Sequence, residues 1–155
     1  MKDSRSRLLW HGMFLFLLGL LVGFVEQKFA NPRMGLAAHL EGVMNGTFLV
    51  ALGAVWNDVI GNPRLKAAAL WGALYATYGN WAATTLAAIF GSGAMSPILA
   101  AGRTAQPWQE AFVTIAFMTI GPAYVASTAV VLWGLRGSDY RTTTGSSTKV
   151  AWPGA

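Results

Sequence analysis

The residues whose types and spacing could support chemistry lie in one apolar stretch, Ala38-His39-Leu40-Glu41-Gly42-Val43-Met44-Asn45-Gly46. At about 100° per residue of a helix, His39, Gly42 and Gly46 fall on one stripe. Glu41 and Asn45 are i, i+4 neighbours on a different face, where their side chains can form a hydrogen bond. The pattern therefore separates a candidate metal ligand from a carboxylate–amide pair.

His39 has two interpretations. A single histidine near a helix end is commonly an ordinary interfacial residue. An axial haem ligand, however, also requires only one imidazole, and glycines on the same stripe would leave room for the flat macrocycle. Gly42 and Gly46 also form a small-xxx-small pair, which is typical of close helix packing. The residues alone leave both interpretations open.

A second group of polar and aromatic residues lies farther along the chain. Trp71, Tyr75 and Tyr78 are spaced to share one face of a helix, and Asn80 lies elsewhere on it. An aromatic stripe of this kind is more often packing than an active site. In lipid, however, the two phenols and the amide need hydrogen-bond partners, which favours a shared polar interior.

Composition points to lipid as the solvent of these elements. Of the 155 residues, 54% are hydrophobic and only 11% are charged, whereas soluble domains carry roughly a quarter charged residues. There is no cysteine, which excludes disulfides, thiolate metal sites and cysteine nucleophiles. The net charge of +5 is scattered singly between apolar runs, so we expect no nucleic-acid partner.

Four apolar stretches each approach the roughly 20 residues needed to cross about 30 Å of hydrocarbon. They span about residues 8–29, 34–59, 65–90 and 108–135. We therefore predict an all-α integral membrane protein in which residues 1–135 form a four-transmembrane-helix bundle. Residues 136–155 are rich in Ser, Thr and Gly and are expected to form a flexible cytoplasmic tail.

The distribution of Lys and Arg predicts the orientation of the bundle. Eight lie at the two termini and in the middle loop, and three lie in the two opposite loops. The eight are Lys2, Arg5, Arg7, Arg64, Lys66, Arg136, Arg141 and Lys149, and the three are Lys28, Arg33 and Arg103. Because positive loops stay inside, both termini are expected in the cytoplasm of a bacterial-type inner membrane.

The run from Asn31 to Phe48 and the start Leu9-Trp10-His11-Gly12-Met13-Phe14-Leu15 resemble the hydroxylaminobenzene mutase family. The resemblance covers roughly residues 8–135. These mutases in turn resemble, more distantly, the styrene oxide isomerases. The resemblance implies a homotrimer of four-span subunits that binds haem b between the subunits and acts on a small aromatic substrate.

The same resemblance assigns site residues. His39 would be the axial ligand, and Gly42 and Gly46 would lie beside the cofactor. The implied catalytic residues are Asn45, Asn80, Tyr75 and Tyr78, of which the asparagines line the pocket. Ala76 and Thr84 stand where the epoxide isomerases are expected to carry an acidic residue and a tyrosine. This difference favours an N-hydroxyarylamine over an epoxide as the substrate.

The implied reaction converts hydroxylaminobenzene to 2-aminophenol, with ferric haem b as a Lewis acid and no external reductant. The first alternative is rearrangement of an epoxide to an aldehyde at the same site. A second is a haem-binding membrane protein without turnover. A small transporter receives little support, because the chain is short and lacks an internal repeat.

Overall fold

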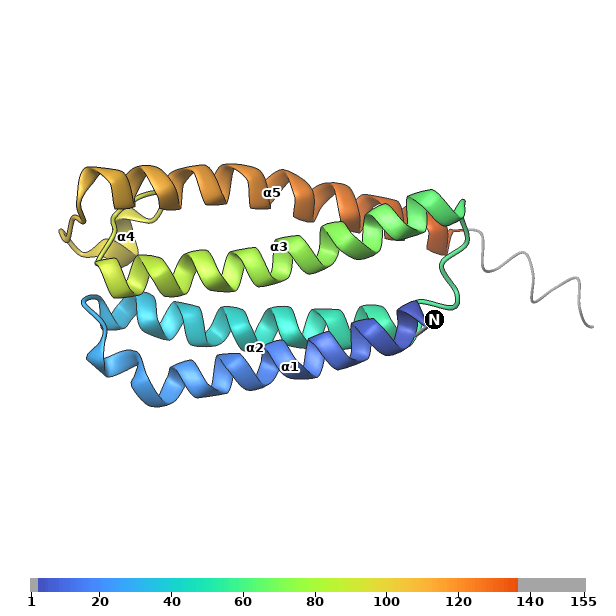
Figure 1. Cartoon of the computed structure of the whole chain (residues 1–155), viewed down its shortest axis with the longest axis horizontal. Coiled ribbons are helices and arrows are strands. Elements are labelled where there is room, and N and C mark those ends of the chain that lie inside the picture. Colours follow the sequence, from blue (N-terminus) through green and yellow to red (C-terminus); the bar gives the residue numbers. More distant parts are fainter. Residues whose placement is uncertain (1–2, 137–155) are drawn as a thin grey trace, which may run out of the picture.

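The computed structural model describes residues 3–136, and four long helices make up most of that range. The elements are α1 (Ser4–Val25), η1 (Glu26–Lys28), α2 (Pro32–Val55), α3 (Pro63–Phe90), α4 (Pro97–Ala100) and α5 (Pro107–Leu135). Figure 1 shows the long helices side by side, with the N-terminus at the same end as the α2–α3 connection. The predicted tail, apart from Arg136, lies outside the described residues.

Asparagine–proline pairs set the starts of the two central helices. The Asn31 side-chain oxygen accepts hydrogen bonds from the backbone nitrogens of Arg33 and Met34, and Asn62 caps α3 through the nitrogen of Arg64. Proline follows each cap at the first helical position, where its missing N–H costs nothing. Both helices therefore begin at an asparagine followed by a proline.

Three helices are long and apolar enough to cross a membrane: α1 with its η1 extension (Ser4–Lys28), α2 and α5. The predicted stretch 65–90 corresponds to α3, which is as long as the others. By length and composition α3 is not among the described helices that qualify. The hydropathy of α3 is lowered by the polar residues within it, which include Asn80, Tyr75, Tyr78 and three threonines.

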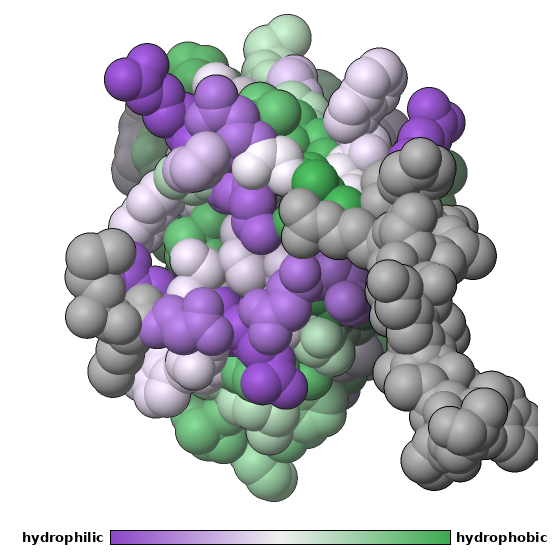
Figure 2. All heavy atoms as spheres, turned by 90° about the vertical axis from the view of Figure 1, so that its right-hand side faces the viewer, coloured by the Kyte–Doolittle hydropathy of each residue, from purple (hydrophilic) through white to green (hydrophobic). Residues whose placement is uncertain are grey.

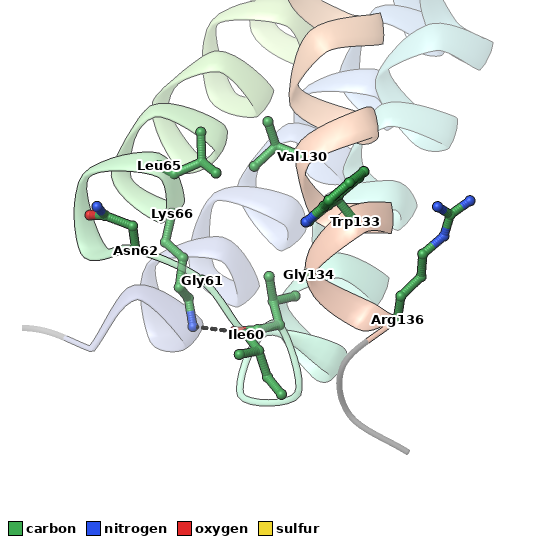
Figure 3. A pocket seen from close by; sticks show the side chains of 10 residues that line it. Ile60, Gly61, Asn62, Leu65, Lys66, Val130, Trp133, Gly134 and Arg136 are labelled. Carbon is green, nitrogen blue, oxygen red and sulfur yellow. Dashed lines mark hydrogen bonds between the residues drawn. The ribbon is translucent and has the colours of Figure 1, made fainter. Parts of the chain in front are cut away.

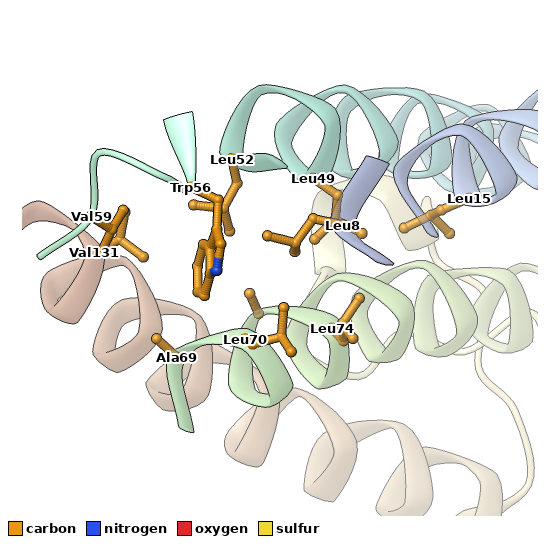
Figure 4. Packing of buried hydrophobic residues seen from close by; sticks show 11 residues of the cluster. Leu8, Leu15, Leu49, Leu52, Trp56, Val59, Ala69, Leu70, Leu74 and Val131 are labelled. Atoms are coloured by element: carbon orange, nitrogen blue, oxygen red, sulfur yellow. The ribbon is translucent and has the colours of Figure 1, made fainter. Parts of the chain in front are cut away.

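The hydrophobic core gathers side chains from all four long helices (Figure 4). Leu8 and Leu49 are fully buried between α1 and α2, Trp56 closes the end of α2, and Val131 contributes from α5. Many of the large apolar side chains face outward instead, among them Phe24, which is 83% exposed. Figure 2 looks onto the bundle end that carries the α2–α3 connection, where hydrophilic side chains gather across the end. An apolar flank with polar ends is the surface expected in a bilayer.

Glycines hold α1 and α2 in close contact. A Cβ atom built on Gly46 would lie 2.5 Å from the Phe16 nitrogen, and one built on Gly42 would lie 2.8 Å from the Gly19 nitrogen. The space beside Gly46 is therefore filled by α1, and the space beside Gly42 is filled by α1 and by the Trp81 side chain of α3. The expectation that these glycines leave room for a macrocycle is wrong for this subunit, because a neighbouring helix already occupies that space.

We expect Gly46→Ala to destabilise the protein by about 1–3 kcal/mol, because the new methyl group meets backbone atoms that cannot move aside. Gly53→Ala is the matched control on the same helix. Its Cβ would meet only side chains of α1, at 3.0 Å or more, and alanine favours a helix over glycine by roughly 0.5–1 kcal/mol. Thermal unfolding in detergent should rank wild type and Gly53→Ala well above Gly46→Ala. Equal melting temperatures for the two variants would contradict this packing.

Residues 91–106 form an ordered cap at the other end of the bundle. Asn31 is fully buried, and its side-chain nitrogen donates to the Leu99 carbonyl at 2.9 Å. The Glu110 carboxylate accepts hydrogen bonds from the Ser92 hydroxyl and from the backbone nitrogens of Gly93, Ala94 and Ala105. The connection is therefore tied both to the start of α2 and to the start of α5.

Candidate functional site

A polar cluster crosses the apolar interior between α2, α3 and α5. The Asn45 side-chain nitrogen donates to Glu41 Oε2 at 3.0 Å, and the Asn80 side-chain nitrogen donates to the same oxygen. From α5, the Tyr124 hydroxyl donates to Asn45 Oδ1 at 3.0 Å. The predicted Glu41–Asn45 pair is confirmed, and the structure brings both predicted asparagines to it.

The cluster fixes some polar atoms and leaves others available. Asn45 is only 4% exposed, and its amide is held from both ends by Tyr124 and Glu41. Phe48 packs against the Tyr124 ring, with centroids 5.3 Å apart. Glu41 and Asn80 are half-buried. Within residues 3–136, neither Glu41 Oε1 nor Asn80 Oδ1 accepts a hydrogen bond. These two oxygens could therefore meet the N–H or O–H group of a ligand.

His39 lies in the contact between α2 and α1. Its Nδ1 donates to the Gly19 carbonyl at 2.8 Å, and a Cβ on Gly23 would lie 2.7 Å from that nitrogen, so the ring lies against α1. This bond places the proton on Nδ1 and leaves Nε2 with a lone pair. Metal-binding histidines commonly donate their second ring nitrogen to a carbonyl in this way. The imidazole therefore fits the role of an iron ligand, whereas Gly42 and Gly46 do not form a cradle.

The histidine and the polar cluster lie on different sides of α2. His39 contacts α1, while Glu41 and Asn45 bond to α3 and α5. Residues two positions apart in an α-helix differ in direction by about 200°. Glu41 therefore points nearly opposite to His39. Within one subunit, therefore, His39 and the polar cluster cannot contact the same bound molecule.

The two predicted tyrosines lie apart from this cluster. Tyr78 pairs with His11, whose Nδ1 is 3.1 Å from the phenolic oxygen, and Tyr75 bonds to Thr119 at 2.7 Å. The two phenols and Asn80 were expected to share a polar interior, but the structure gives them different partners. Residues 78 and 80 are two positions apart and point to nearly opposite sides of the helix. Tyr124 supplies the phenol of the cluster instead.

Sequence analysis missed Tyr124 as a site residue. A usable signal was present: within the membrane, a phenol in an otherwise apolar helix needs a hydrogen-bond partner. Its neighbours in the chain, Ala123 and Val125, offer no side-chain partner. Ser127 and Thr128 lie one turn along the same helix and offer hydroxyl groups at the right spacing, so the sequence does not identify Asn45 of α2 as the partner.

A pocket of about 510 Å³ lies at the bundle end between the α2–α3 connection, α3 and α5 (Figure 3). Lys66 lies at its wall, but its amine donates to the Val59 carbonyl at 2.7 Å, as the dashed line in Figure 3 shows. The same amine stands 5.5 Å from the centre of the Trp56 ring. It also lies 3.5 Å from the carbonyl of Trp56, the C-cap of α2. Because these backbone carbonyls hold the Lys66 amine, we do not take this pocket as the candidate site.

Comparison with known proteins identifies the family of the chain. The family model described as "Styrene oxide isomerase" matches residues 4–136. The chain belongs to the styrene oxide isomerase family. It is 45% identical to hydroxylaminobenzene mutase HabB of Ectopseudomonas oleovorans over 139 residues, which is 89% of this chain and 85% of the relative. It is 38% identical to hydroxylaminobenzene mutase HabA of the same organism over 125 residues, 80% of this chain and 93% of the relative.

No solved structure matches the chain. The two relatives nevertheless confirm the resemblance to the hydroxylaminobenzene mutases. This member of the family is therefore an enzyme of the isomerase (mutase) class. Three of its described helices are long and apolar enough to cross a membrane, as expected of a membrane protein.

Proposed function

We propose that this enzyme rearranges hydroxylaminobenzene to 2-aminophenol. The observation that carries the proposal is the Glu41–Asn45–Asn80–Tyr124 cluster, a polar site on three helices of an apolar bundle. Polar groups at such depth are costly and are retained where they have a function. The names of the two similar mutases supply the substrate class.

The reaction defines what the cluster must do. The N–O bond breaks, a C–O bond forms at the ortho carbon, the ring loses a proton there and the nitrogen gains one. Atoms and electrons balance without an oxidant or reductant. Glu41 Oε1 is the base that accepts the ring proton, and the Asn80 carbonyl oxygen accepts a hydrogen bond from the substrate. The Asn45 amide nitrogen already donates to Glu41 and to the Thr77 carbonyl, so it has no N–H group left for the substrate. Asn45, held in turn by the Tyr124 hydroxyl, positions the carboxylate.

His39 is the residue that would hold haem b. Its Nδ1–H bond to the Gly19 carbonyl orients the ring and makes Nε2 a better ligand. When bound, ferric haem would supply a Lewis acid that weakens the N–O bond. The imidazole is half-buried and adjoins an outer face on which Leu36 and Leu40 are about half exposed, at 49% and 47%.

Assembly would unite the two parts of the site. His39 and the cluster lie on nearly opposite sides of α2, so the His39 side of one subunit would face the cluster side of the next. A head-to-tail contact of this kind forms a ring with cyclic symmetry when the rotation between neighbouring subunits closes. The homotrimer implied by the family resemblance is a ring of this kind. In it, α3 would be the fourth span of each subunit, and both termini would lie on the cytoplasmic side of the inner membrane.

Epoxide rearrangement is the second candidate, because the matching family model is described as a styrene oxide isomerase. An epoxide differs from a hydroxylamine in having no N–H or O–H group. The free oxygens of Glu41 and Asn80 are acceptors, which favours a substrate that donates hydrogen bonds.

The proposal is tested by incubating the purified protein with hydroxylaminobenzene or styrene oxide in parallel. We expect 2-aminophenol from the first without added NADH, and much slower turnover of the second. In heavy-oxygen water the product hydroxyl should stay unlabelled, because the oxygen is retained. Preferred turnover of styrene oxide would support the second candidate, and a requirement for NADH would exclude an isomerisation.

A further inference from the structure

A groove between α1 and α3 lies apart from the cluster and is lined by aromatic side chains. Two adjoining hollows of about 640 and 530 Å³ share the walls Trp10, His11, Trp71 and Leu74. Volumes of 300–1,000 Å³ are typical of small-molecule sites. Arg7 lies at one hollow, while Tyr75 and Tyr78 line the other. The groove therefore contains the aromatic stripe and the histidine that the proposed reaction does not use.

Among the aromatic residues of the groove, the His11 imidazole has an acceptor that is not used. The Tyr78 hydroxyl donates to the His11 carbonyl at 3.2 Å, so its own oxygen is free to accept from His11 Nδ1, 3.1 Å away. That arrangement places the imidazole proton on Nδ1. Within the described residues, His11 Nε2 has no partner, and it is not among the buried unpaired atoms. A neutral imidazole nitrogen of this kind accepts one hydrogen bond.

The ring system around this nitrogen favours a flat ligand. The Trp10 indole meets the His11 ring edge to face, with centroids 4.9 Å apart, and Trp71 lies across the groove. Both indoles are more than half exposed, at 58% and 59%. Aromatic surfaces prefer offset or edge contacts with another aromatic ring. A lipid chain would fill the apolar wall but would leave His11 Nε2 without a donor.

We propose that this groove is a second binding site, for a small aromatic molecule with an N–H or O–H group, such as an aniline or a phenol. The ring packs between Trp10 and Trp71, and its donor group bonds to His11 Nε2. Only the identity of the natural ligand rests on the proposed function. That ligand would be the hydroxylaminobenzene substrate or the 2-aminophenol product. Its chemistry follows from the groove itself.

Fluorine NMR titration of the full chain in lipid nanodiscs tests the site, with empty nanodiscs as the background. The probes are 4-fluoroaniline and its N,N-dimethyl derivative, which has the same ring and no donor. We expect saturable binding of 4-fluoroaniline that His11→Phe weakens roughly five- to tenfold, the loss of one hydrogen bond. The dimethyl probe should bind weakly and equally to both proteins, whereas Trp71→Leu should weaken binding of both probes.

Equal affinity of the two probes for wild type, or unchanged 4-fluoroaniline binding in His11→Phe, would overturn the proposal. So would the absence of saturable binding, as expected if lipid or a second copy covers the groove. Retained binding of the dimethyl probe shows that His11→Phe is folded. Glu41→Gln should keep full probe affinity. Binding in a protein that does not turn over hydroxylaminobenzene would leave this site standing and remove the proposed function alone.

Discussion

Replacing His39 with alanine should remove most of the haem from the purified protein, and with it the Soret band and the mutase activity. His39 is the imidazole whose Nδ1 is committed to the Gly19 carbonyl, which leaves Nε2 to bind iron. Loss of a group that hydrogen-bonds to a metal ligand already costs roughly 10–100-fold in metal affinity, so loss of the ligand itself should cost more. Absorption spectra and pyridine haemochrome assays of wild type and variant measure the effect.

Two variants sharpen this experiment. His11→Ala removes the other histidine, which pairs with Tyr78, and should leave the haem content near that of wild type. Gly23→Ala keeps His39 but places a methyl group 2.7 Å from Nδ1, so it should displace the ring and lower haem content without removing the ligand. Full haem in purified His39→Ala would reject the assignment, and wild type without haem would remove the cofactor from the proposal.

The helical architecture followed from the sequence because its signals are local. Apolar runs of membrane length and the pairs Asn31-Pro32 and Asn62-Pro63 fix where α2 and α3 begin. The hydrogen bond between Glu41 and Asn45 is local too, since both residues belong to one helix. Such features depend only on spacing within an element.

The choice of partners between helices did not follow from the sequence. The glycine stripe of α2 predicts that another group packs closely against it. The stripe would look the same whether that group were helix α1 or a macrocycle. Similarly, the spacing of Tyr75 and Tyr78 defines one face of α3 and not the helix that this face meets. Tyr124 joined the site through Asn45, a residue 79 positions away in the chain. Tertiary packing between helices decides these partners, and residue spacing within one helix does not specify it.

The second large effect is expected at the carboxylate. Glu41→Gln keeps the size of the side chain but removes the base, so kcat should fall by about 10²–10⁴-fold, the usual contribution of a general base. The haem content should be unchanged, because the substitution keeps His39 and its hydrogen bond to the Gly19 carbonyl. Glu41→Asp should recover part of the rate. Tyr124→Phe, which frees the Asn45 amide from its hydroxyl partner, should reduce kcat less, by roughly tenfold.

An isotope effect separates a base from a merely structural carboxylate. If Glu41 accepts the ring proton, its loss should make C–H cleavage rate-limiting, so substrate deuterated at the ortho positions should react more slowly than normal substrate in Glu41→Gln. Wild type should show a smaller difference. A structural role would lower the rate through misfolding, with reduced haem content and no new isotope effect. Glu41→Gln with wild-type kcat would exclude Glu41 as the base and leave the Asn80 side chain as the remaining candidate for contact with the substrate.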